Sequence, residues 1–324
     1  MILAGDVGGT KTLLGLFDVA DRRPAQRLSC SYVTSDYPSF TAILDAFERD
    51  IGHRVTVDAV AAGVAGPVVA NVARLTNIAW DISAAEIARR LGTPRVQLLN
   101  DLEAMANGVD VLTPDEFVLL QEGIARSDAN SAVIAAGTGL GAAFLHRVNG
   151  RLVPMPSESG HADFAARTDR ELELVRMLRE LYGRAEVEHV LSGPGLLNLH
   201  RFTHRGGECE MLAGVDPRDA PARVSMAGLS GRCQGCAEAM RMFVVAYGAE
   251  AGNMALRGLA MSGLYIGGGI APKILPALTG GAFMEAFLAK EPMRELLTRV
   301  PVKVIVNPET GLLGAAVHAQ GMTR

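Results

Sequence analysis

The chain has 324 residues, of which 49% are hydrophobic and 20% are charged, and its formal net charge is -4. This length exceeds what one hydrophobic core usually serves, so we expect two domains or one large α/β unit. The sequence has no dense block of Lys or Arg, which argues against nucleic acid or an acidic membrane surface as a partner. Small molecules are the expected partners.

The first residues, MILAGDVGGTKTLLGLF, are apolar but lack a basic leader and are interrupted by Asp6 and several glycines. This pattern fits neither a signal peptide nor a membrane helix. The four cysteines are too few for a disulfide scaffold in a chain of this length. We therefore expect a cytoplasmic protein.

In chain order, residues 1–5 and 10–19 are two β-rich runs joined by DVGG, which predicts a hairpin turned on glycine. Residues 55–66 and 95–100 predict two buried strands. Between them, SAAEIARRLG predicts a short helix with a capping box, Ser83 with Glu86, and a terminal Gly92.

The second half repeats this theme, because residues 130–148 again read as strand, Gly-Thr-Gly turn and returning strand. We interpret this as a weak internal duplication. Residues 170–183 and 236–260 have helical patterns, and strands are expected in 263–273 and 301–307, before ETGLLGAAVHAQG. The alternation of strands and helices favours an α/β architecture. No linker separates the halves, so the domain boundary must lie in packed structure.

The fragment GDVGGT can carry nucleotide chemistry. Gly5, Gly8 and Gly9 allow a tight turn whose N–H groups can cradle phosphate oxygens, while Asp6 and Thr10 offer oxygens for a hydrated Mg²⁺. An ordinary glycine hairpin explains this fragment equally well, and the fragment does not match the dinucleotide pattern G-x-G-x-x-G.

The same chemistry recurs at Gly137, Thr138 and Gly139, and a strand runs into glycine at Gly267, Gly268 and Gly269. A single glycine turn is weak evidence for a nucleotide site. Together these segments predict a nucleotide surrounded from more than one side.

Seven motifs occur here in the order found in bacterial glucokinases: GDVGGTKT, LTNIAWDIS, LLNDLEA, GTGLGAAF, ESGHADF, EHVLSGPGLLNL and GGGIAPK. The chain resembles this family, which belongs to the superfamily of actin-like proteins, sugar kinases and chaperone ATPases, over nearly its whole length. It looks closer to the ATP-dependent glucokinase branch than to the repressor and open-reading-frame kinase branch, whose zinc-binding cysteine cluster is not intact here.

The resemblance implies an actin-like (ribonuclease H-like) α/β fold, with a cleft between a smaller domain, residues 1–107 plus 311–324, and a larger domain, residues 108–310. It implies ATP and Mg²⁺ as cofactors, D-glucose as the sugar, glucose 6-phosphate and ADP as products, and a homodimer.

It also assigns residues. Asp101 would be the general base that takes the proton of the 6-hydroxyl, and Asn100 would hold a neighbouring hydroxyl. The other sugar contacts would be Asn77, Glu158, His161 and Glu188. The nucleotide would contact Gly5, Asp6, Val7, Gly8, Gly9, Thr10, Gly137, Thr138, Gly139, Gly268 and Gly269, with Asp6 bound to Mg²⁺ through water.

Without the resemblance, these residues have simpler interpretations. An Asn-Asp pair before a helix is more often a cap, and Glu188 would pass for a surface carboxylate. His161 could equally satisfy a backbone carbonyl. Alternative functions are a kinase for another hexose, such as mannose or an aminohexose, and a sugar sensor without turnover. The sensor is disfavoured because relatives of that kind carry a DNA-binding helical domain ahead of the first motif.

A further group consists of His200, His204, Cys209, Cys233 and Cys236. The two histidines are spaced to share a helix face, and Cys-x-x-Cys is a common zinc half-site. The spacing between the pairs fits no compact zinc finger, so the pattern favours core cysteines and surface histidines. Whether the group binds zinc stays open at the level of sequence.

Overall fold

The computed structural model describes residues 1–75, 78–207 and 209–323. The chain divides into two compact units, which we call unit 1 (Met1–Pro114 with Asn307–Arg324) and unit 2 (Asp115–Val306). These boundaries lie at 114 and 306, whereas the resemblance placed them at 107 and 310. Residues after 107 stay with unit 1, where Val111 is buried in one core with residues of β1 and α11.

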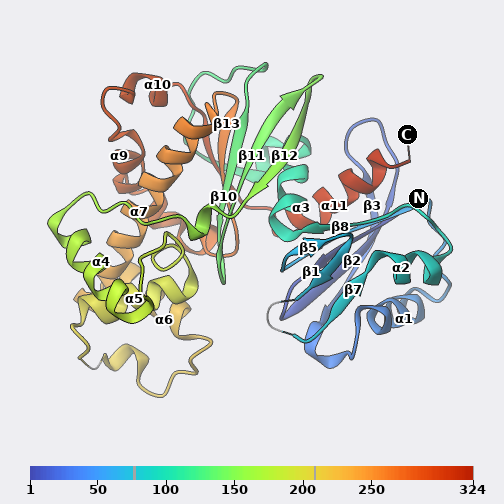
Figure 1. Ribbon diagram of the computed structural model, residues 1–324, viewed down its shortest axis with the longest axis horizontal. Helices are drawn as coiled ribbons and strands as arrows, with labels where there is room; N and C mark the ends of the chain where they lie inside the picture. Colours follow the sequence, from blue (N-terminus) through green and yellow to red (C-terminus); the bar gives the residue numbers. More distant parts are fainter. Residues whose placement is uncertain (76–77, 208, 324) are drawn as a thin grey trace. The chain divides into compact units, whose positions relative to one another are not determined.

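Unit 1 contains a five-stranded sheet in the order β3-β2-β1-β4-β8 (Figure 1). Its strands are β1 (Ile2–Val7), β2 (Lys11–Asp18), β3 (Ala25–Val33), β4 (Ala59–Val64) and β8 (Val96–Asn100). Strands β1, β4 and β8 are parallel, and β2 pairs antiparallel with both β1 and β3. The predicted hairpin is confirmed, since Val7 pairs with Thr12 across the glycine turn.

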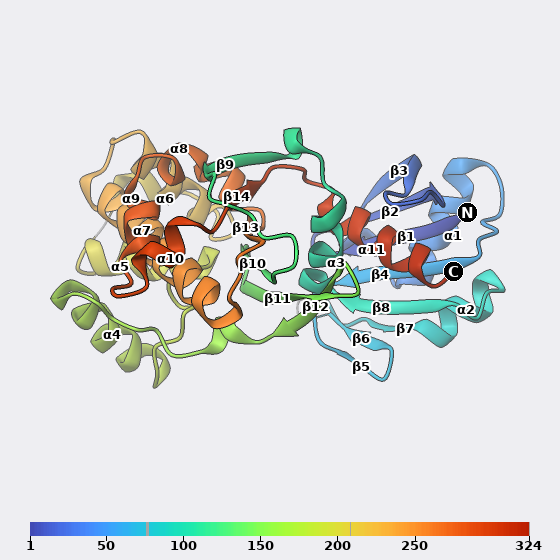
Figure 2. The same ribbon diagram turned by 90° about the horizontal axis from the view of Figure 1, so that it is seen from above.

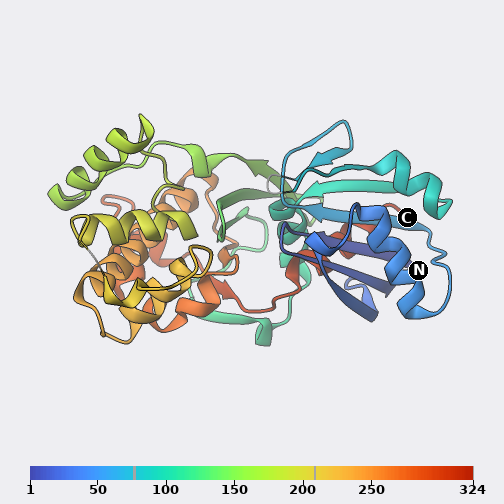
Figure 3. The same ribbon diagram turned by 90° about the horizontal axis from the view of Figure 1, so that it is seen from below.

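Helices cover both faces of this sheet (Figure 3). One face packs on α1 (Phe40–Ile51) and α2 (Ala84–Leu91), and the other on α3 (Asp101–Gly108) and α11 (Thr310–Gly321). Alternate residues of a strand point to opposite faces, so Leu3 joins the α1 side, whereas Ile2 and Ala4 join the α11 side. Asp6 is in step with Ile2 and Ala4 and therefore belongs to the α11 side.

The smaller elements of unit 1 are β5 (Val68–Val69), β6 (Val72–Arg74), β7 (Asp81–Ser83), η1 (Thr34–Asp36) and η2 (Val109–Val111); η3 (Pro114–Glu116) follows at the boundary. The predicted capping box at α2 is wrong. Ser83 is the N-cap residue, but its side chain makes no capping hydrogen bond. The N–H of Ala84, the first residue of the helix, donates to the carbonyl of Asn71. The predicted end at Gly92 is confirmed, in a left-handed conformation.

Unit 2 contains a six-stranded sheet in the order β12-β11-β10-β13-β14-β9 (Figure 2). Its strands are β9 (Phe117–Gln121), β10 (Ser131–Ala136), β11 (Leu140–Val148), β12 (Arg151–Ser157), β13 (Gly263–Gly267) and β14 (Val302–Ile305). In this sheet, β10 pairs antiparallel with β11, β11 pairs antiparallel with β12, and β10, β13 and β14 are parallel. Each of the two sheets therefore joins an antiparallel β-meander to two further parallel strands. This shared topology confirms the internal duplication.

One face of the second sheet packs on α7 (Gln234–Gly258), whose Phe243, Tyr247 and Met254 are fully buried. The other helices of unit 2 are α4 (Asp169–Tyr182), α5 (Gly193–Thr203), α6 (Ala220–Leu229), α8 (Leu275–Leu278), α9 (Ala282–Leu288) and α10 (Arg294–Thr298), with η4 (Ser159–His161), η5 (Glu210–Leu212) and η6 (Ala271–Ile274). Within the described residues, no helix combines the length and apolar character that crossing a membrane requires.

The interpretation of His200 and His204 as surface residues is wrong. Their rings stack with centroids 4.0 Å apart, and Nε2 of His204 lies 3.2 Å from the Cys233 sulfur. The polar Nε2 atom of His200 is buried. The C-terminal end of α5 lies beside the N-terminal end of α7 in the fold, which brings these histidines to the cysteines.

Candidate active site

The parallel strands of unit 1 end side by side. Val7 pairs with Val64, and Val64 pairs with Asn100, so β1, β4 and β8 finish in one row. In open α/β sheets, ligands bind outside the carboxyl ends of the strands. Three predicted site residues, Asp6, Asn100 and Asp101, lie at this edge.

The turn between β1 and β2 is held by hydrogen bonds. The N–H of Gly8 donates to the Lys11 carbonyl at 2.9 Å, and the hydroxyl of Thr34 donates to the Gly8 carbonyl at 2.8 Å. The N–H of Thr34 donates to the carbonyl of Thr10 at 3.0 Å. Gly8, Gly9 and Thr10 are thus presented at the sheet edge in a fixed backbone.

Two other predicted nucleotide residues lie inside strand β1. Val7 is fully buried in the α1-side core. Gly5 lies against β4, where an added Cβ would come 3.1 Å from the Cβ of Ala62. Of the GDVGGT motif, the turn residues therefore lie beyond the end of β1, and the Asp6 side chain lies on its α11 side.

Asp6 lies in an unfavourable environment for a charged carboxylate. Burial and the negative charge of Asp101 raise its pKa from 3.8 to about 6, although Lys11 opposes the change. Its carboxylate touches the first turn of α11, where an ideal Cβ on Gly311 would lie 2.9 Å from Oδ2. A cation placed between Asp6 and Asp101 would relieve their repulsion.

Asn100 and Asp101 form the start of α3. Asn100 is the N-cap residue, with its Oδ1 accepting from the N–H of Leu102 at 3.0 Å and its Nδ2 donating to the Gly66 carbonyl at 3.3 Å. Oδ1 of Asp101 accepts from the same N–H at 2.8 Å, and the residue is exposed. The pair is therefore a helix cap and also presents a carboxylate to solvent.

A glycine lets α3 reach this position. An added Cβ on Gly63 of β4 would lie 2.6 Å from the Cβ of Ala104, closer than any side chain could tolerate. Close packing of α3 on β4 therefore depends on Gly63, and it places Asp101 directly after the strand ends.

In unit 2, the Gly-Thr-Gly turn joins β10 to β11. The N–H of Gly137 donates to the Gly139 carbonyl at 2.8 Å, and the N–H of Gly193 donates to the Gly137 carbonyl at 2.9 Å. The second bond attaches the turn to the first residue of α5, whose N-terminus carries partial positive charge. Ser192 caps that helix by accepting from the N–H of Gly195.

The third glycine segment lies beside the second. Gly268 has φ +83°, and an added Cβ would come 2.3 Å from the carbonyl oxygen of Ala136. The hydroxyl of Tyr247 accepts from the N–H of Ala136 at 3.2 Å. Gly269 has open space around its Cα. The ends of β10 and β13 thus place Gly137–Gly139 and Gly268–Gly269 at one edge.

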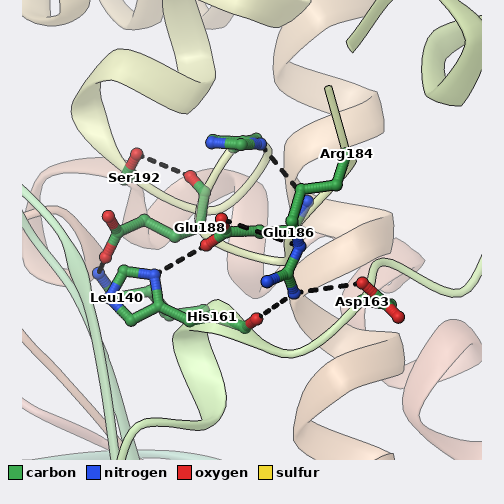
Figure 4. A network of polar contacts seen from close by, with 8 residues as sticks. Leu140, His161, Asp163, Arg184, Glu186, Glu188 and Ser192 are labelled. Atoms are coloured by element: carbon green, nitrogen blue, oxygen red, sulfur yellow. Dashed lines mark hydrogen bonds and ion pairs between the residues drawn. The ribbon is translucent and has the colours of Figure 1, made fainter. Parts of the chain in front are cut away.

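Two of the predicted sugar residues of unit 2, His161 and Glu188, lie close together (Figure 4). Nδ1 of His161 lies 2.6 Å from Oε2 of Glu186. This hydrogen bond raises the pKa of His161, and the charges of Glu188 and Glu158 add to the effect. Oε2 of Glu188 accepts from the N–H of Leu140 at 2.7 Å. His161, Glu158 and Glu188 therefore form one electrostatic group.

Sequence reasoning missed Glu186, Gly311 and Lys11 as neighbours of the site. Glu186 stands two residues before Glu188, at the start of a turn in which the N–H of His189 donates to the Glu186 carbonyl, and no sequence pattern indicated it. The contact of Gly311 with Asp6 joins residues far apart in the chain, and no local pattern announces it. Asn77 lies outside the described residues.

Comparison with known proteins agrees with this geometry. The glucokinase family model matches residues 3–322. A glucokinase of Nostoc punctiforme is 37% identical over 337 residues, covering 98% of each chain. The crystal structure of glucokinase from an Antarctic psychrotroph is 28% identical, with a TM-score of 0.87 over 99% of this chain and 98% of that chain. A glucokinase of the ROK family from Streptomyces griseus, solved with glucose and AMPPNP, has a TM-score of 0.64 at 20% identity, covering 99% of each chain.

The two duplicated α/β units therefore have the actin-like ATPase fold that sugar kinases share. The chain belongs to the glucokinase family.

Proposed function

We propose that this protein transfers the γ-phosphoryl group of ATP to the 6-hydroxyl of D-glucose, giving glucose 6-phosphate and ADP. Membership of the glucokinase family supports the reaction. The observation that carries the chemistry is Asp101, an exposed carboxylate oriented by the N–H of Leu102 at the edge of a parallel sheet.

Asp101 is assigned the role of general base. A sugar hydroxyl is a poor nucleophile, and a carboxylate that takes its proton as attack begins contributes roughly 10²–10⁴-fold to the rate. The N–H of Leu102 donates to Oδ1 of Asp101 and so orients the carboxylate that we assign to the hydroxyl proton.

The remaining sugar residues would orient the 6-hydroxyl. The resemblance assigns Asn100 to this role, and its amide is already fixed by Leu102 and Gly66. It assigns Glu158, His161 and Glu188 to the same role. Carboxylates and amides can engage vicinal hydroxyls bidentately, and a site built on such bonds can reject an analogue that lacks one partner by as much as ~10⁴–10⁵-fold. Asn77 is assigned to the sugar on resemblance alone.

The nucleotide would lie against the turns Gly8–Thr10, Gly137–Gly139 and Gly268–Gly269, with the backbone N–H groups of Gly9, Thr10, Thr138, Gly139, Gly268 and Gly269 as donors, because the N–H groups of Gly8 and Gly137 hold their own turns. The positive end of α5, hydrogen-bonded to the Gly137 carbonyl, favours a phosphate at that turn. Mg²⁺ fits beside Asp6, because burial and the negative charge of Asp101 make a charged Asp6 carboxylate unfavourable without a cation. When bound, the ion would neutralise phosphate charge. A homodimer and a cytoplasmic location stay predictions from the resemblance and the sequence.

The test is the initial rate of ADP release from Mg²⁺-ATP with glucose, mannose, glucosamine or N-acetylglucosamine at matched concentrations, with a sugar-free control. We expect turnover that depends on glucose and is slower with the other sugars. Faster turnover with another hexose would change the proposed substrate. Absence of turnover with every sugar would contradict the proposed function.

A further inference from the structure

A cluster of soft metal ligands lies in unit 2, at the opposite end of α5 from Gly193 and the Gly-Thr-Gly turn. The cluster consists of His200, His204, Cys209, Cys233 and Cys236. It brings together three segments: the end of α5, the connection that follows it, and the start of α7.

The sulfur atoms have the separation that a shared metal requires. Sγ of Cys209 lies 3.9 Å from Sγ of Cys233 and 3.9 Å from Sγ of Cys236. Ligands at ~2.3 Å from a tetrahedral Zn²⁺ lie ~3.8 Å from one another. A disulfide would need sulfurs at about 2.05 Å, and all three cysteines are free.

His204 is oriented as a metal ligand. Its Nδ1 lies 2.8 Å from the carbonyl oxygen of His200, which can only accept, so Nδ1 carries the proton. In the neutral ring, Nε2 then has its lone pair available, and it lies 3.2 Å from Sγ of Cys233. Metal-binding histidines are usually fixed in this way, with the second ring nitrogen donating to a carbonyl.

An independent observation is the buried Nε2 of His200, which has no hydrogen-bond partner among the described residues. Ligand atoms of His200, His204, Cys209 and Cys236 all lie within 4.8 Å of one another. A buried polar atom without a partner is unfavourable. The cluster therefore lacks a group that would satisfy it.

We propose that unit 2 binds a structural Zn²⁺ through His204, Cys209, Cys236 and Cys233. The first three have ligand atoms within 4.8 Å of one another, and the distances of Cys233 from Cys209 and His204 match the edges of a tetrahedron. Thiolate and imidazole ligands in a tetrahedral set favour zinc over magnesium or calcium. His200 is the competing fourth donor.

Four protein ligands leave no open position for a substrate, so the ion acts on the structure. It ties the end of α5 to the start of α7. The other end of α5 is bonded to the Gly-Thr-Gly turn through Gly193. Loss of the metal should therefore lower the thermal stability of the protein.

The experiment measures zinc by mass spectrometry in the full-length, untagged protein purified without added metal. We expect a stoichiometric amount of zinc, lost in Cys209→Ser, Cys236→Ser and Cys233→Ser. The control is Cys30→Ser, since this cysteine lies in β3 of unit 1; it should retain the metal. Removal of zinc by a chelator should lower Tm, and added zinc should restore it.

Cobalt titration of the metal-depleted wild-type protein tests the site even if the variants fail to fold. A tetrahedral visible spectrum with a thiolate charge-transfer band would support the proposal, and an octahedral spectrum or no binding would overturn it. Fewer than four free thiols in the denatured, unreduced protein would indicate a disulfide and would also overturn it. Zinc retained in Cys233→Ser but lost in His200→Asn would overturn the assignment of the fourth ligand.

Discussion

Asp6 and Gly311 touch across more than three hundred residues of sequence: an ideal Cβ on Gly311 would lie 2.9 Å from Oδ2 and 3.1 Å from Cγ of Asp6. Asp6 is the next-to-last residue of β1, whose alternation points its side chain toward α11, and Gly311 lies in the first turn of that helix. The carboxylate therefore has its position because the helix carries no side chain there.

The substitution Gly311→Ala should displace Asp6. A misplacement of ~1 Å can cost about 10²-fold in rate, so we expect kcat/KM for Mg²⁺-ATP to fall by at least about tenfold. The matched control is Gly321→Ala at the end of the same helix, where nothing lies within 4 Å of the added Cβ. Steady-state kinetics of both variants would make the comparison, and equal activities would contradict the role of this contact.

The substitution Asp6→Asn should stabilise the protein at neutral pH while lowering its activity. Because the folded state raises the pKa of Asp6 from 3.8 to about 6, the folded protein holds this proton more tightly, and stability falls as pH rises through that window. The variant lacks this penalty, which at most amounts to about 3 kcal/mol above the window.

Thermal unfolding should therefore show a higher Tm for Asp6→Asn than for wild type at about pH 8, and a smaller difference at about pH 4. The exposed Asp36→Asn serves as the control. A difference in Tm between Asp6→Asn and wild type that grew on acidification would contradict the predicted direction of the pH dependence.

The substitution Glu186→Gln should weaken sugar binding by lowering the pKa of His161. Loss of the carboxylate partner should lower the pKa of His161 toward its ordinary value, because the hydrogen bond that His161 donates to Glu186 is the main cause of the increase. We expect KM for glucose to rise about three- to tenfold, the range of one net hydrogen bond.

NMR titration of the histidine rings would measure the pKa, with the His161 signal assigned by its loss in His161→Asn. Glu180→Gln, an exposed change on α4, is the control. An unchanged His161 titration in Glu186→Gln would rule out the proposed coupling.

Glu188 should respond differently to two substitutions. Glu188→Gln keeps an oxygen that can accept from the N–H of Leu140, so we expect a normal Tm with a higher KM for glucose. Glu188→Ala leaves that N–H without its partner, and we expect a loss of about 1–3 kcal/mol in the free energy of unfolding. Equal stability of the two variants in chemical denaturation would contradict the structural part of this role.

Local patterns predicted much of the fold. The hairpin around Gly8, the strand before Asn100 and the end of α2 at Gly92 follow from glycine and alternating apolar residues. The strand predicted from residue 55 begins at Ala59, because Val55 and Val57 are buried without joining the ladder. The capping box failed because the Ser83 side chain makes no capping hydrogen bond, although Ser83 is the N-cap residue.

The candidate site was predictable where it follows strand ends. Asp6 and Asp101 come directly after apolar runs, and parallel pairing aligns those ends. The contact of Gly311 with Asp6, the pairing of His161 with Glu186, and the cluster around Cys236 all depend on tertiary packing. Spacing along the chain carries no information about such contacts.

The central claim is that Asp101 takes the proton of the sugar hydroxyl, and the most direct test is Asp101→Asn. Single-turnover and steady-state rates of ADP release would be measured with glucose, alongside glucose affinity by calorimetry, with Glu103→Gln on the same helix as control. We expect kcat to fall by roughly 10²–10⁴-fold, with glucose affinity kept within a few-fold and Glu103→Gln close to wild type. Turnover of Asp101→Asn within a few-fold of wild type would contradict the assignment of the base.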